Sequence, residues 1–316
     1  MASQKPIVVV GSINTDLVSI TRRIPAVGET VIGTDFQIHP GGKGANQAVA
    51  VARLGYPVQL IGRLGRDIFG DQLRSHLRNT GVDITAIASS ETASGVATIV
   101  VSETGANSIV VTPGANAEVT PGDLDRNIDV IRSAGIVLTQ LEIPIETIEY
   151  LVWLCTREGV SLMLDPAPAM ELPPSLFKQV AWFTPNQSEA AFYLEAGASS
   201  KDLSPQEIAN ELSTKGSSGV LLKMGEQGVF LTDHHAAGTL IPAFAVSAVD
   251  TTGAGDAFNG GFAAGLMLGK SPIESAIFAA AVAGISVTRR GAQPSMPSRS
   301  EVETFLEDKL AGSNSR

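Results

Sequence analysis

Short apolar runs alternate with longer helical stretches along much of the chain. An early run, Ile7–Val10, ends at Gly11. After residue 120 the pattern predicts four more strands, which alternate with helical stretches. They are Ile136–Leu141, Leu162–Asp165, Trp182–Thr184 and Val220–Lys223. Regular alternation of this kind is typical of βαβ units, which form a parallel sheet with helices on both faces. The pattern therefore predicts an α/β fold.

Two β patches, at about residues 15–39 and 94–113, are left over from this alternation. The first contains a strand-like segment at Thr30–Gly33, and the second contains a good hairpin turn at Glu103–Ala106. Each patch is too small to fold alone. No linker or internal repeat is visible. We therefore expect one domain, residues 1–316, in which the two patches pair with each other as a lid.

The clearest helical patterns are rich in small residues. Residues 44–54 are Ala-rich, and the apolar segments 254–268 and 272–289 are rich in Ala and Gly. Small side chains let a helix approach its neighbours closely, so these segments are predicted to be buried against the sheet. The Gly312–Ser315 tail is predicted to be frayed.

Composition excludes several classes of protein. Hydrophobic residues make up 44% of the 316 residues and charged residues 17%, which is typical of an ordered globular chain. The net charge of −10 argues against binding nucleic acid through a basic surface, although a local cationic pocket for an anionic substrate remains possible. No stretch approaches 18 consecutive apolar residues, so no membrane contact is expected. Cys155 is the single cysteine and no export signal is visible, so we expect a cytoplasmic protein without disulfides.

The first candidate site follows the first strand, in the segment Gly11–Asp16. Ligands of parallel α/β sheets bind outside the carboxyl ends of the strands. Asn14 and Asp16 are two residues apart and face the same way in extended backbone, where an amide and a carboxylate suit sugar hydroxyls. An Asx turn that closes the strand is the simpler explanation of the local pattern alone.

The second candidate is the glycine-rich segment Gly41–Asn46. Three glycines around Lys43 bring backbone amides close to a ligand at the start of a helix, whose amino end attracts anions. The segment is not a Walker A loop, because Gln37 stands where that loop has its first glycine and Gly44 replaces the Ser or Thr. A tight strand-to-helix turn explains two glycines but not all three together with the lysine and Asn46.

A third segment, Asn186–Glu189, follows a predicted strand. Asn followed three residues later by Glu is a variant of the helix capping box, and this structural explanation is as good as any functional one.

The fourth candidate, Asp250–Phe258, is the most informative. A strand-like segment ends near Val249, and a Gly-x-Gly turn then begins a helix of small residues. The amides of residues 253–256 are predicted to converge on one point as an anion hole. Asp256 lies beside that point and can accept the proton of a hydroxyl that attacks the bound anion. A helix start needs one cap, not two aspartates around Gly-Ala-Gly, so a purely structural explanation is the weaker one.

Several other motifs are missing or weak. The four histidines lack metal-binding spacing, and the chain has neither a GxSxG elbow nor a CxxC pair. Phe258 stands where a dinucleotide fingerprint needs its third glycine, and Gly11 is followed by Asn14 and Asp16 rather than by that fingerprint, so an oxidoreductase is rejected. Residues 223–228 and 288–295, taken alone, are explained by a turn and a helix stop.

Taken together and in this order, the segments resemble the ribokinase-like carbohydrate kinases, the phosphofructokinase-B type. The resemblance rests on GGKGAN (41–46) and DTTGAGDAF (250–258), supported by GSINTD (11–16), DPAPA (165–169), TPNQSEA (184–190) and TRRGAQPS (288–295). It implies a three-layer α/β/α sandwich with a mostly parallel central sheet and a small β lid that also makes a homodimer contact. It also implies transfer of phosphate from MgATP to O5 of D-ribose, giving D-ribose 5-phosphate and ADP.

The resemblance assigns roles to individual positions. Asp256 is implied as the catalytic base, with Gly253, Ala254 and Gly255 as the anion hole. The sugar is implied to contact Asn14, Asp16, Gly42, Lys43, Asn46, Glu142 and Asp256. The ATP site is implied at Asn186, Lys223, Gly225, Gly228 and Gly255, with Glu189 ordering Mg²⁺ through water. A K⁺ site is implied at Asp250, Thr252, Ser286, Arg289, Gly291 and Ser295.

Two positions depart from the family pattern. Lys223 stands where Thr or Ser is common, and its charge is placed to contact either the phosphates or the adenine side. Ala280 stands where His or Asn often lies beside adenine, which bears on nucleotide choice. The acceptor also has alternatives, because 2-deoxyribose, fructose or adenosine fits the same fold. A sugar sensor without turnover ranks last, since the base and the anion hole are both intact.

Overall fold

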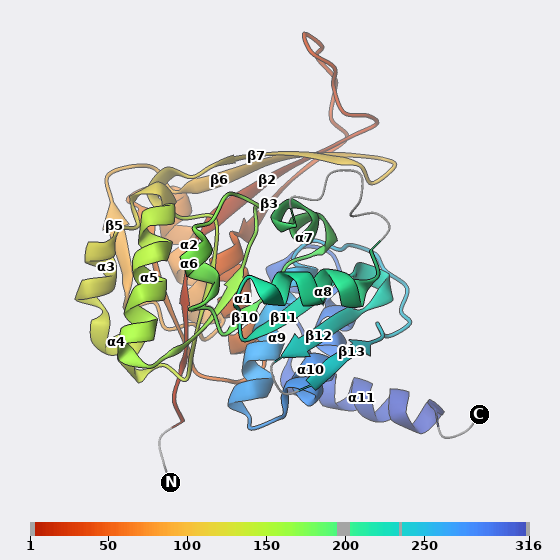
Figure 1. Cartoon of the computed structure of the whole chain (residues 1–316). Coiled ribbons are helices and arrows are strands. Elements are labelled where there is room, and N and C mark those ends of the chain that lie inside the picture. Colours follow the sequence, from red (N-terminus) through yellow and green to blue (C-terminus); the bar gives the residue numbers. More distant parts are fainter. Residues whose placement is uncertain (1–3, 195–202, 234–235, 314–316) are drawn as a thin grey trace.

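The computed structural model describes residues 4–194, 203–233 and 236–313. Within this part of the chain, nine strands form one sheet in the order β13-β12-β11-β10-β9-β8-β1-β4-β5 (Figure 1). Their bounds are β1 Ile7–Val10, β4 Val58–Gly65, β5 Ile87–Ser90, β8 Ile136–Gln140, β9 Ser161–Asp165, β10 Trp182–Phe183, β11 Gly219–Lys223, β12 Val229–Asp233 and β13 Ala236–Ile241. All pairs from β11 through to β5 are parallel, so the predicted parallel sheet and its five predicted strands are confirmed.

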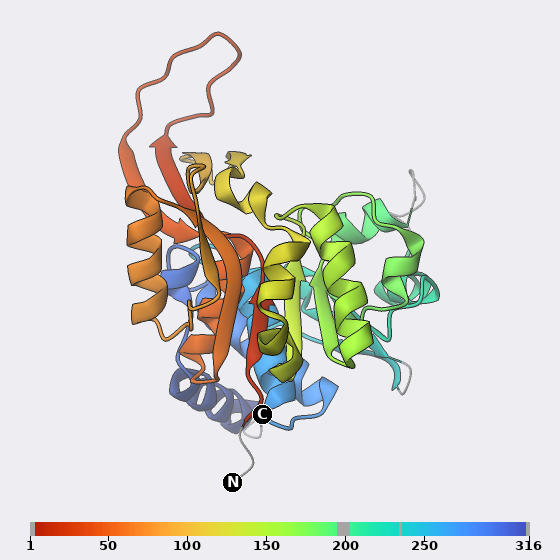
Figure 2. The same ribbon diagram turned by 90° about the vertical axis from the view of Figure 1, so that its left-hand side faces the viewer.

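Helices cover both faces of this sheet, as Figures 1 and 2 show. Strand β1 explains why: Ile7 and Val9 pack in one apolar cluster, whereas Val8 and Val10 pack in the other. The first cluster includes residues of α1 (Lys43–Arg53), α2 (Ile68–Asn79), α9 (Ala254–Met267), α10 (Pro272–Ser286) and α11 (Arg299–Ser313). The second includes residues of α3 (Pro121–Arg126), α4 (Ile128–Ser133), α5 (Ile145–Glu158), α6 (Pro174–Phe177), α7 (Gln187–Tyr193) and α8 (Pro205–Thr214). The three-layer α/β/α sandwich is therefore confirmed.

The Ala- and Gly-rich helices pack as closely as their composition predicts. A Cβ added at Gly260 of α9 would lie 2.6 Å from the Cβ of Ala50 in α1, and one added at Gly265 would lie 2.9 Å from Ser275 in α10. Because no side chain fits at these crossings, α9 is fixed between α1 and α10. The packing sets the position of the amino end of α9, where the fourth candidate site lies.

The two leftover β patches form a separate four-stranded sheet in the order β3-β2-β6-β7. Its strands are β2 (Asn14–Thr21), β3 (Asp35–Gly41), β6 (Gly95–Ser102) and β7 (Asn107–Thr112). Only the pair between β2 and β6 is parallel. The expected pairing of the two patches is confirmed.

The structure corrects several boundaries. Thr30–Gly33 is not a strand, because residues 22–34 form a loop that extends beyond the smaller sheet (Figure 2). Strands β5, β12 and β13 were not predicted, and β12 pairs antiparallel with both of its neighbours. Helix α10 ends at Ser286 rather than at residue 289. Helix α11 includes Gly312 and Ser313, part of the tail that was predicted to be frayed, whereas Asn314 and Ser315 lie outside the described residues.

Short 3-10 segments complete the described part of the chain: η1 (Gly114–Glu118), η3 (Gly225–Gln227) and η4 (Gln293–Ser295). In the described residues, no helix combines the length and the apolar character that crossing a membrane requires. Cys155 is a free thiol inside α5, where burial raises its pKa to about 12.

Candidate active site

The candidate residues converge where the carboxyl ends of β8, β9 and β11 meet the amino ends of α1 and α9. On the α1 and α9 side of the sheet, Gln140 ends β8, Asp165 ends β9 and Lys223 ends β11. The register places Gln140 directly beside Asp165. This edge is where parallel α/β sheets bind ligands, so the topology supports the sequence-based prediction of a site here.

Asp256 lies in the first turn of α9 and is 5% exposed. Its Oδ2 accepts a hydrogen bond from Nδ2 of Asn46 at 2.9 Å, and its Oδ1 accepts one from Nε2 of Gln47 at 3.1 Å. Burial raises the pKa of Asp256, and the nearby Lys43 ammonium opposes that rise. Both donors come from α1, so the close contact between the two helices holds this carboxylate in place.

The turn before Asp256 depends on glycine. Gly253 caps α9 with φ of 73°, a left-handed conformation that a side chain disfavours. The amide of Ala254 donates to the carbonyl of Thr251 at 3.2 Å. The amides of Gly255 and Asp256 belong to the first helical turn, where amides have no partner within the helix. The amino end of α9 thus presents donors toward the site.

Gln47 joins two carboxylates. Its Nε2 donates to Oδ1 of Asp256 and, at 3.0 Å, to Oδ2 of Asp165, while its Oε1 accepts from Nε2 of Gln140 at 2.8 Å. The Gln140 contact fixes which end of the amide faces the carboxylates. Lys223 completes the chain of contacts, because its Nζ lies 2.9 Å from Oδ1 of Asp165.

The glycine-rich segment wraps against the loop after β1. Gly42 caps α1 with φ of 86°, and a Cβ there would lie 2.6 Å from the backbone nitrogen of Asn14. The amide of Lys43 and the hydroxyl of Ser12 both donate to Oε2 of Glu142, at 3.1 and 2.5 Å. These contacts bring together three segments that were predicted to bind the sugar.

Lys43 is surrounded by carboxylates. Burial alone lowers its pKa, but the charges of Asp256, Asp165, Glu142 and Glu189 together raise the pKa above its usual value. The lysine is therefore firmly protonated and balances several of the acidic groups of the site.

Asn14 and Asp16 approach from the smaller sheet. Oδ1 of Asn14 accepts from Nδ2 of Asn116 at 2.7 Å. The carboxylate of Asp16 occupies the space where a side chain at Gly41 would lie. Burial, with the charges of Glu142 and Asp256, raises the pKa of Asp16 to about 7. Asp16 therefore faces the same acidic centre as Asp256, although the two residues belong to different parts of the fold.

The residues expected at the nucleotide lie along the next strand ends. Asn186 caps α7 in a complete capping box with Glu189, so the structural explanation of that motif is correct. Asn186 also pairs with Lys223 in a parallel bridge. A Cβ added at Gly255 would lie 3.5 Å from Nζ of Lys223, so these segments meet at the amino end of α9. Gly225 and Gly228 lie in the turn between β11 and β12, where the amide of Gly228 donates to the carbonyl of Gly225.

The segments expected to hold K⁺ also lie together. The carboxylate of Asp250 accepts from the amide of Gly291 at 2.8 Å and from the amide and hydroxyl of Thr252 at 2.9 and 2.6 Å. Ser286 and Ser295 are buried, and their hydroxyls donate to carbonyl oxygens of residues 283 and 292. The side chain of Arg289 instead points to Glu301, at 2.6 Å.

A metal site made of side chains is not present in the described part of the chain, where no three His, Cys, Asp or Glu residues gather suitably. A site made mainly of backbone carbonyl oxygens does not need such a group. The loop around Asp250 fits that second kind of site, since its carboxylate ties the two carbonyl-bearing segments together.

Comparison with known proteins shows which family has this sequence and fold. The chain matches the pfkB family carbohydrate kinases over residues 4–299. The chain belongs to this family. It is 41% identical over 305 residues to the ribokinase of Bacillus subtilis (strain 168), covering 95% of this chain and 99% of that protein. It is 36% identical over 303 residues to a deoxyribokinase of Salmonella typhi, covering 95% and 98%.

Solved structures agree with the membership of this chain in the pfkB family. The structure of Arabidopsis thaliana ribokinase complexed with ribose and ATP matches this chain with a TM-score of 0.87 at 34% identity, covering 96% of this chain and 98% of that one. The ribokinase-like fold that the sequence motifs implied is thereby confirmed.

Five residues of this pfkB kinase site were not assigned a role from the sequence. They are Gln47, Asn116, Gln140, Asp165 and Gln293. Signals were available for four of them: Gln47 directly follows a motif residue, Asp165 and Gln293 lie within quoted motifs, and Gln140 lies near the end of a predicted strand. The role of Asn116 appears only in three dimensions, where its side chain contacts Asn14, 102 positions away in the chain.

The raised pKa of Asp16 has a measurable effect on stability. The folded protein binds the Asp16 proton more tightly than the unfolded chain, whose ordinary value is 3.8, so stability from this group falls as pH rises from about 4 to 7. We expect Asp16→Asn to raise the free energy of unfolding relative to the unmodified protein, by about 2 kcal/mol more at pH 8 than at pH 5. Urea denaturation at the two pH values measures this.

Asp35→Asn is the matched control, because Asp35 lies on the neighbouring strand β3 but is exposed. Its effect on stability is expected to be the same at both pH values. If the effect of Asp16→Asn on the free energy of unfolding were also the same at pH 5 and pH 8, the raised pKa of Asp16 would be contradicted.

Proposed function

We propose that this chain is an ATP-dependent kinase that converts D-ribose to D-ribose 5-phosphate and releases ADP. One observation carries the proposal: a buried Asp256, held by two amides, lies in the first turn of α9 and is close enough to Asp16 of the smaller sheet to raise its pKa. The resemblance to proteins named ribokinase supports ribose as the acceptor. We also propose that residues 1–316 form one kinase domain, with segments 15–39 and 94–113 as its lid.

The sugar is proposed to bind between the smaller sheet and the first turn of α1. Carboxylates and amides accept and donate hydrogen bonds to several hydroxyls at once, which suits a polyhydroxylated substrate. The proposed contacts are Asn14, Asp16, Gly42, Lys43, Asn46, Glu142 and Asp256. Closure of the lid over the sugar would exclude water, which otherwise competes for the phosphoryl group.

Asp256 is proposed as the general base. The 5-hydroxyl oxygen attacks the γ-phosphorus, the bond to the β,γ-bridging oxygen breaks, and the hydroxyl proton passes to the carboxylate of Asp256. Each carboxylate oxygen has a second lone pair, so the contacts with Asn46 and Gln47 leave room for this proton. The amides of Gly253, Ala254 and Gly255 are proposed to stabilise charge on the transferring phosphoryl group, with the Ala254 amide released from its turn.

The nucleotide is proposed to bind along Asn186, Lys223, Gly225, Gly228 and Gly255. Both carboxylate oxygens of Glu189 already accept hydrogen bonds from Asn186. Glu189 is therefore better suited to contact Mg²⁺ through a water molecule than to bind it directly. When bound, Mg²⁺ would neutralise phosphate charge. Ala280 is 9% exposed on α10, and its small side chain leaves the choice of base open.

K⁺ is proposed to bind at Asp250, Thr252, Ser286, Arg289, Gly291 and Ser295, mostly through carbonyl oxygens. The support is the contact of Asp250 with Gly291, which ties this loop to the turn that carries Asp256. When bound, K⁺ would order residues 250–256.

Turnover is therefore expected to be faster in potassium than in a large organic cation such as tetramethylammonium. Equal rates in the two cations would contradict the proposed K⁺ site.

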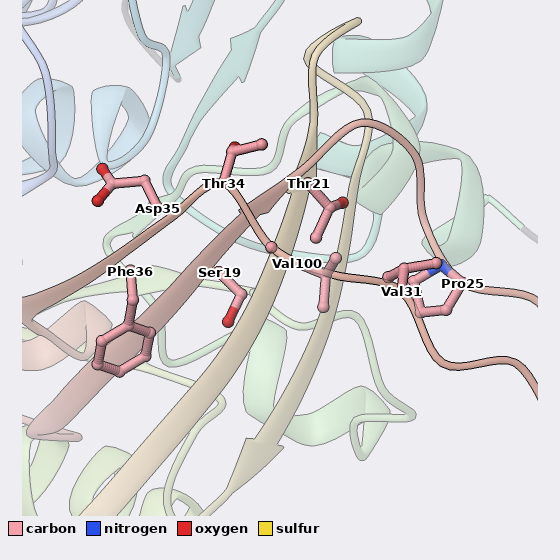
Figure 3. A pocket seen from close by; sticks show the side chains of 9 residues that line it. Ser19, Thr21, Pro25, Val31, Thr34, Asp35, Phe36 and Val100 are labelled. Atoms are coloured by element: carbon pink, nitrogen blue, oxygen red, sulfur yellow. The ribbon is translucent and has the colours of Figure 1, made fainter.

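A homodimer is proposed through the outer face of the smaller sheet. The register places Ser19, Phe36 and Val100 on one face, opposite to Asp16, and these side chains line a pocket there (Figure 3). Ile38 on the same face is 52% exposed, and Phe36 is 57% exposed. A second copy would cover this apolar face.

Sedimentation velocity of the whole chain tests the dimer. We expect a dimer that Ile38→Asp converts to monomer, because the charge would be buried against the second copy. Ile277→Asp, at an exposed position on α10, is the control and should leave the dimer intact. A monomeric unmodified protein, or a dimer that survives Ile38→Asp, would refute this interface.

The acceptor is tested by ADP release from MgATP in potassium, with ribose, 2-deoxyribose, fructose, adenosine or no acceptor. We expect the highest kcat/KM with ribose and little ADP without a sugar. The match to a deoxyribokinase makes 2-deoxyribose the strongest competitor. A preference for another acceptor would move the specificity but keep the chemistry, and absence of turnover with all of them would refute the proposed function.

Asp256→Asn tests the base. The amide cannot take the proton, so kcat should fall by at least about 100-fold. Binding of ribose and ATP, measured by calorimetry, should persist because the shape of the side chain is preserved. Asp129→Asn, at a side chain that is 93% exposed, is the control and should keep full activity. A near-normal kcat in the Asp256→Asn variant would show that another group is the base.

A further inference from the structure

Lys223 places a cation at the amino end of α9. Its side chain is 14% exposed, its Nζ lies 2.9 Å from Oδ1 of Asp165, and a Cβ added at Gly255 would lie 3.5 Å from that Nζ. The ammonium is therefore next to Gly255 in the first turn of the helix.

This placement is electrostatically unfavourable on its own. The amino end of a helix carries a partial positive charge, which repels a cation and attracts an anion. Asp165 offsets the repulsion, because its carboxylate accepts from Lys223 on one oxygen and from Gln47 on the other. A phosphate bound at this point would reverse the situation, since both the helix end and the ammonium would then attract it.

The simplest alternative is that Lys223 and Asp165 form an ion pair with a purely structural role. Buried ion pairs contribute little to stability compared with apolar packing of similar volume, so stability alone is a weak reason for a lysine here. An ordinary structural pair also does not require the ammonium to lie beside a helix amino end. The adenine side is disfavoured as well, because the Nζ lies beside Gly255 at the amino end of α9, where a phosphate is the favoured ligand.

We propose that Lys223 binds the γ-phosphate of the nucleotide and that Asp165 is a positioning residue that holds its ammonium at the amino end of α9. This inference rests on the proposed function and deepens it. No bond is made to Lys223: its N–H groups donate to phosphate oxygens and neutralise charge during transfer. Lys43 and Lys223 then approach the reacting centre from α1 and β11.

The test compares the affinities of AMP, ADP and the non-hydrolysable β,γ-imido analogue of ATP by calorimetry in the presence of Mg²⁺. The ratio of the ADP and analogue dissociation constants isolates the γ-phosphate. We expect Lys223→Met to reduce this ratio by about tenfold or more, the size of a charge-assisted hydrogen bond, and to change AMP binding less than twofold. Lys178→Met, at an exposed lysine, is the control and should leave the ratio unchanged.

Partner substitutions separate the contact from a structural effect. The double variant Lys223→Met with Asp165→Asn removes both charges, should keep the melting temperature close to that of the unmodified protein, and should still lose the γ-phosphate increment. Asp165→Asn alone keeps an acceptor oxygen but loses the charge that holds Lys223, so it should lose part of the increment, less than Lys223→Met does. An unchanged ratio in Lys223→Met, or equal weakening of all three nucleotides, would overturn the proposal, and an unchanged ratio in Asp165→Asn would overturn the positioning role of Asp165.

The unmodified protein distinguishes this failure from failure of the proposed function. If it phosphorylates a sugar and binds the analogue, but Lys223→Met keeps the ratio, only the role of Lys223 is wrong. If it shows neither turnover nor binding of the analogue, the proposed function itself is wrong.

Discussion

The structure of the site depends on keeping one carboxylate, Asp256, in a nearly waterless position. Removing a charge from water is costly unless hydrogen bonds and opposite charge replace the solvent. Asn46 and Gln47 supply the hydrogen bonds, and Lys43 supplies the charge. All three belong to the first turns of α1, so the amino ends of α1 and α9 must lie against each other. Gly260 permits this, because its missing side chain leaves space for Ala50 and for the carbonyl of Gln47. The contact between α1 and α9 therefore both packs the two helices together and places the carboxylate of Asp256.

The second constraint is that the site is completed across two sheets. Asp16 reaches the acidic centre from β2, where its carboxylate takes the space left by Gly41 on β3. Burial, together with the charges of Glu142 and Asp256, raises its pKa and makes its ionised form unfavourable in the absence of a ligand. A sugar hydroxyl that donates to Asp16 would remove part of this cost. The contact between the two sheets is thus less favourable when the site is empty, which suits the proposed role of the smaller sheet as a lid.

Local sequence was sufficient to predict most of the strands of the parallel sheet and the glycine-rich turns of the candidate site. The strands β8 to β11, the pairing of the two β patches and the turn before Asp256 all follow from short-range patterns of apolar residues and glycine. Contacts between distant segments were not predictable in this way. Gln47 is separated from Asp165 by 118 positions and from Asp256 by 209, and its place directly after a motif residue does not indicate which carboxylates it contacts. The antiparallel edge formed by β12 and β13 was missed for a related reason, because two short strands after a turn are also compatible with a loop.

The charge balance of the centre explains why these long-range contacts are needed. Four carboxylates, those of Asp16, Glu142, Asp165 and Asp256, face the two ammonium groups of Lys43 and Lys223. Without further partners, burial and the excess negative charge would favour protonation of the carboxylates, and the raised pKa values of Asp16 and Asp256 show this tendency. The amide of Gln47 limits it by donating to two carboxylates at once, so that neighbouring acids share one neutral donor instead of one proton. A neutral bridge has a further consequence: it stabilises both ionised groups without adding a positive charge that would hold a transferred proton away from Asp256. The arrangement therefore limits protonation of Asp256 and leaves its carboxylate able to accept a proton, as its proposed role of general base requires.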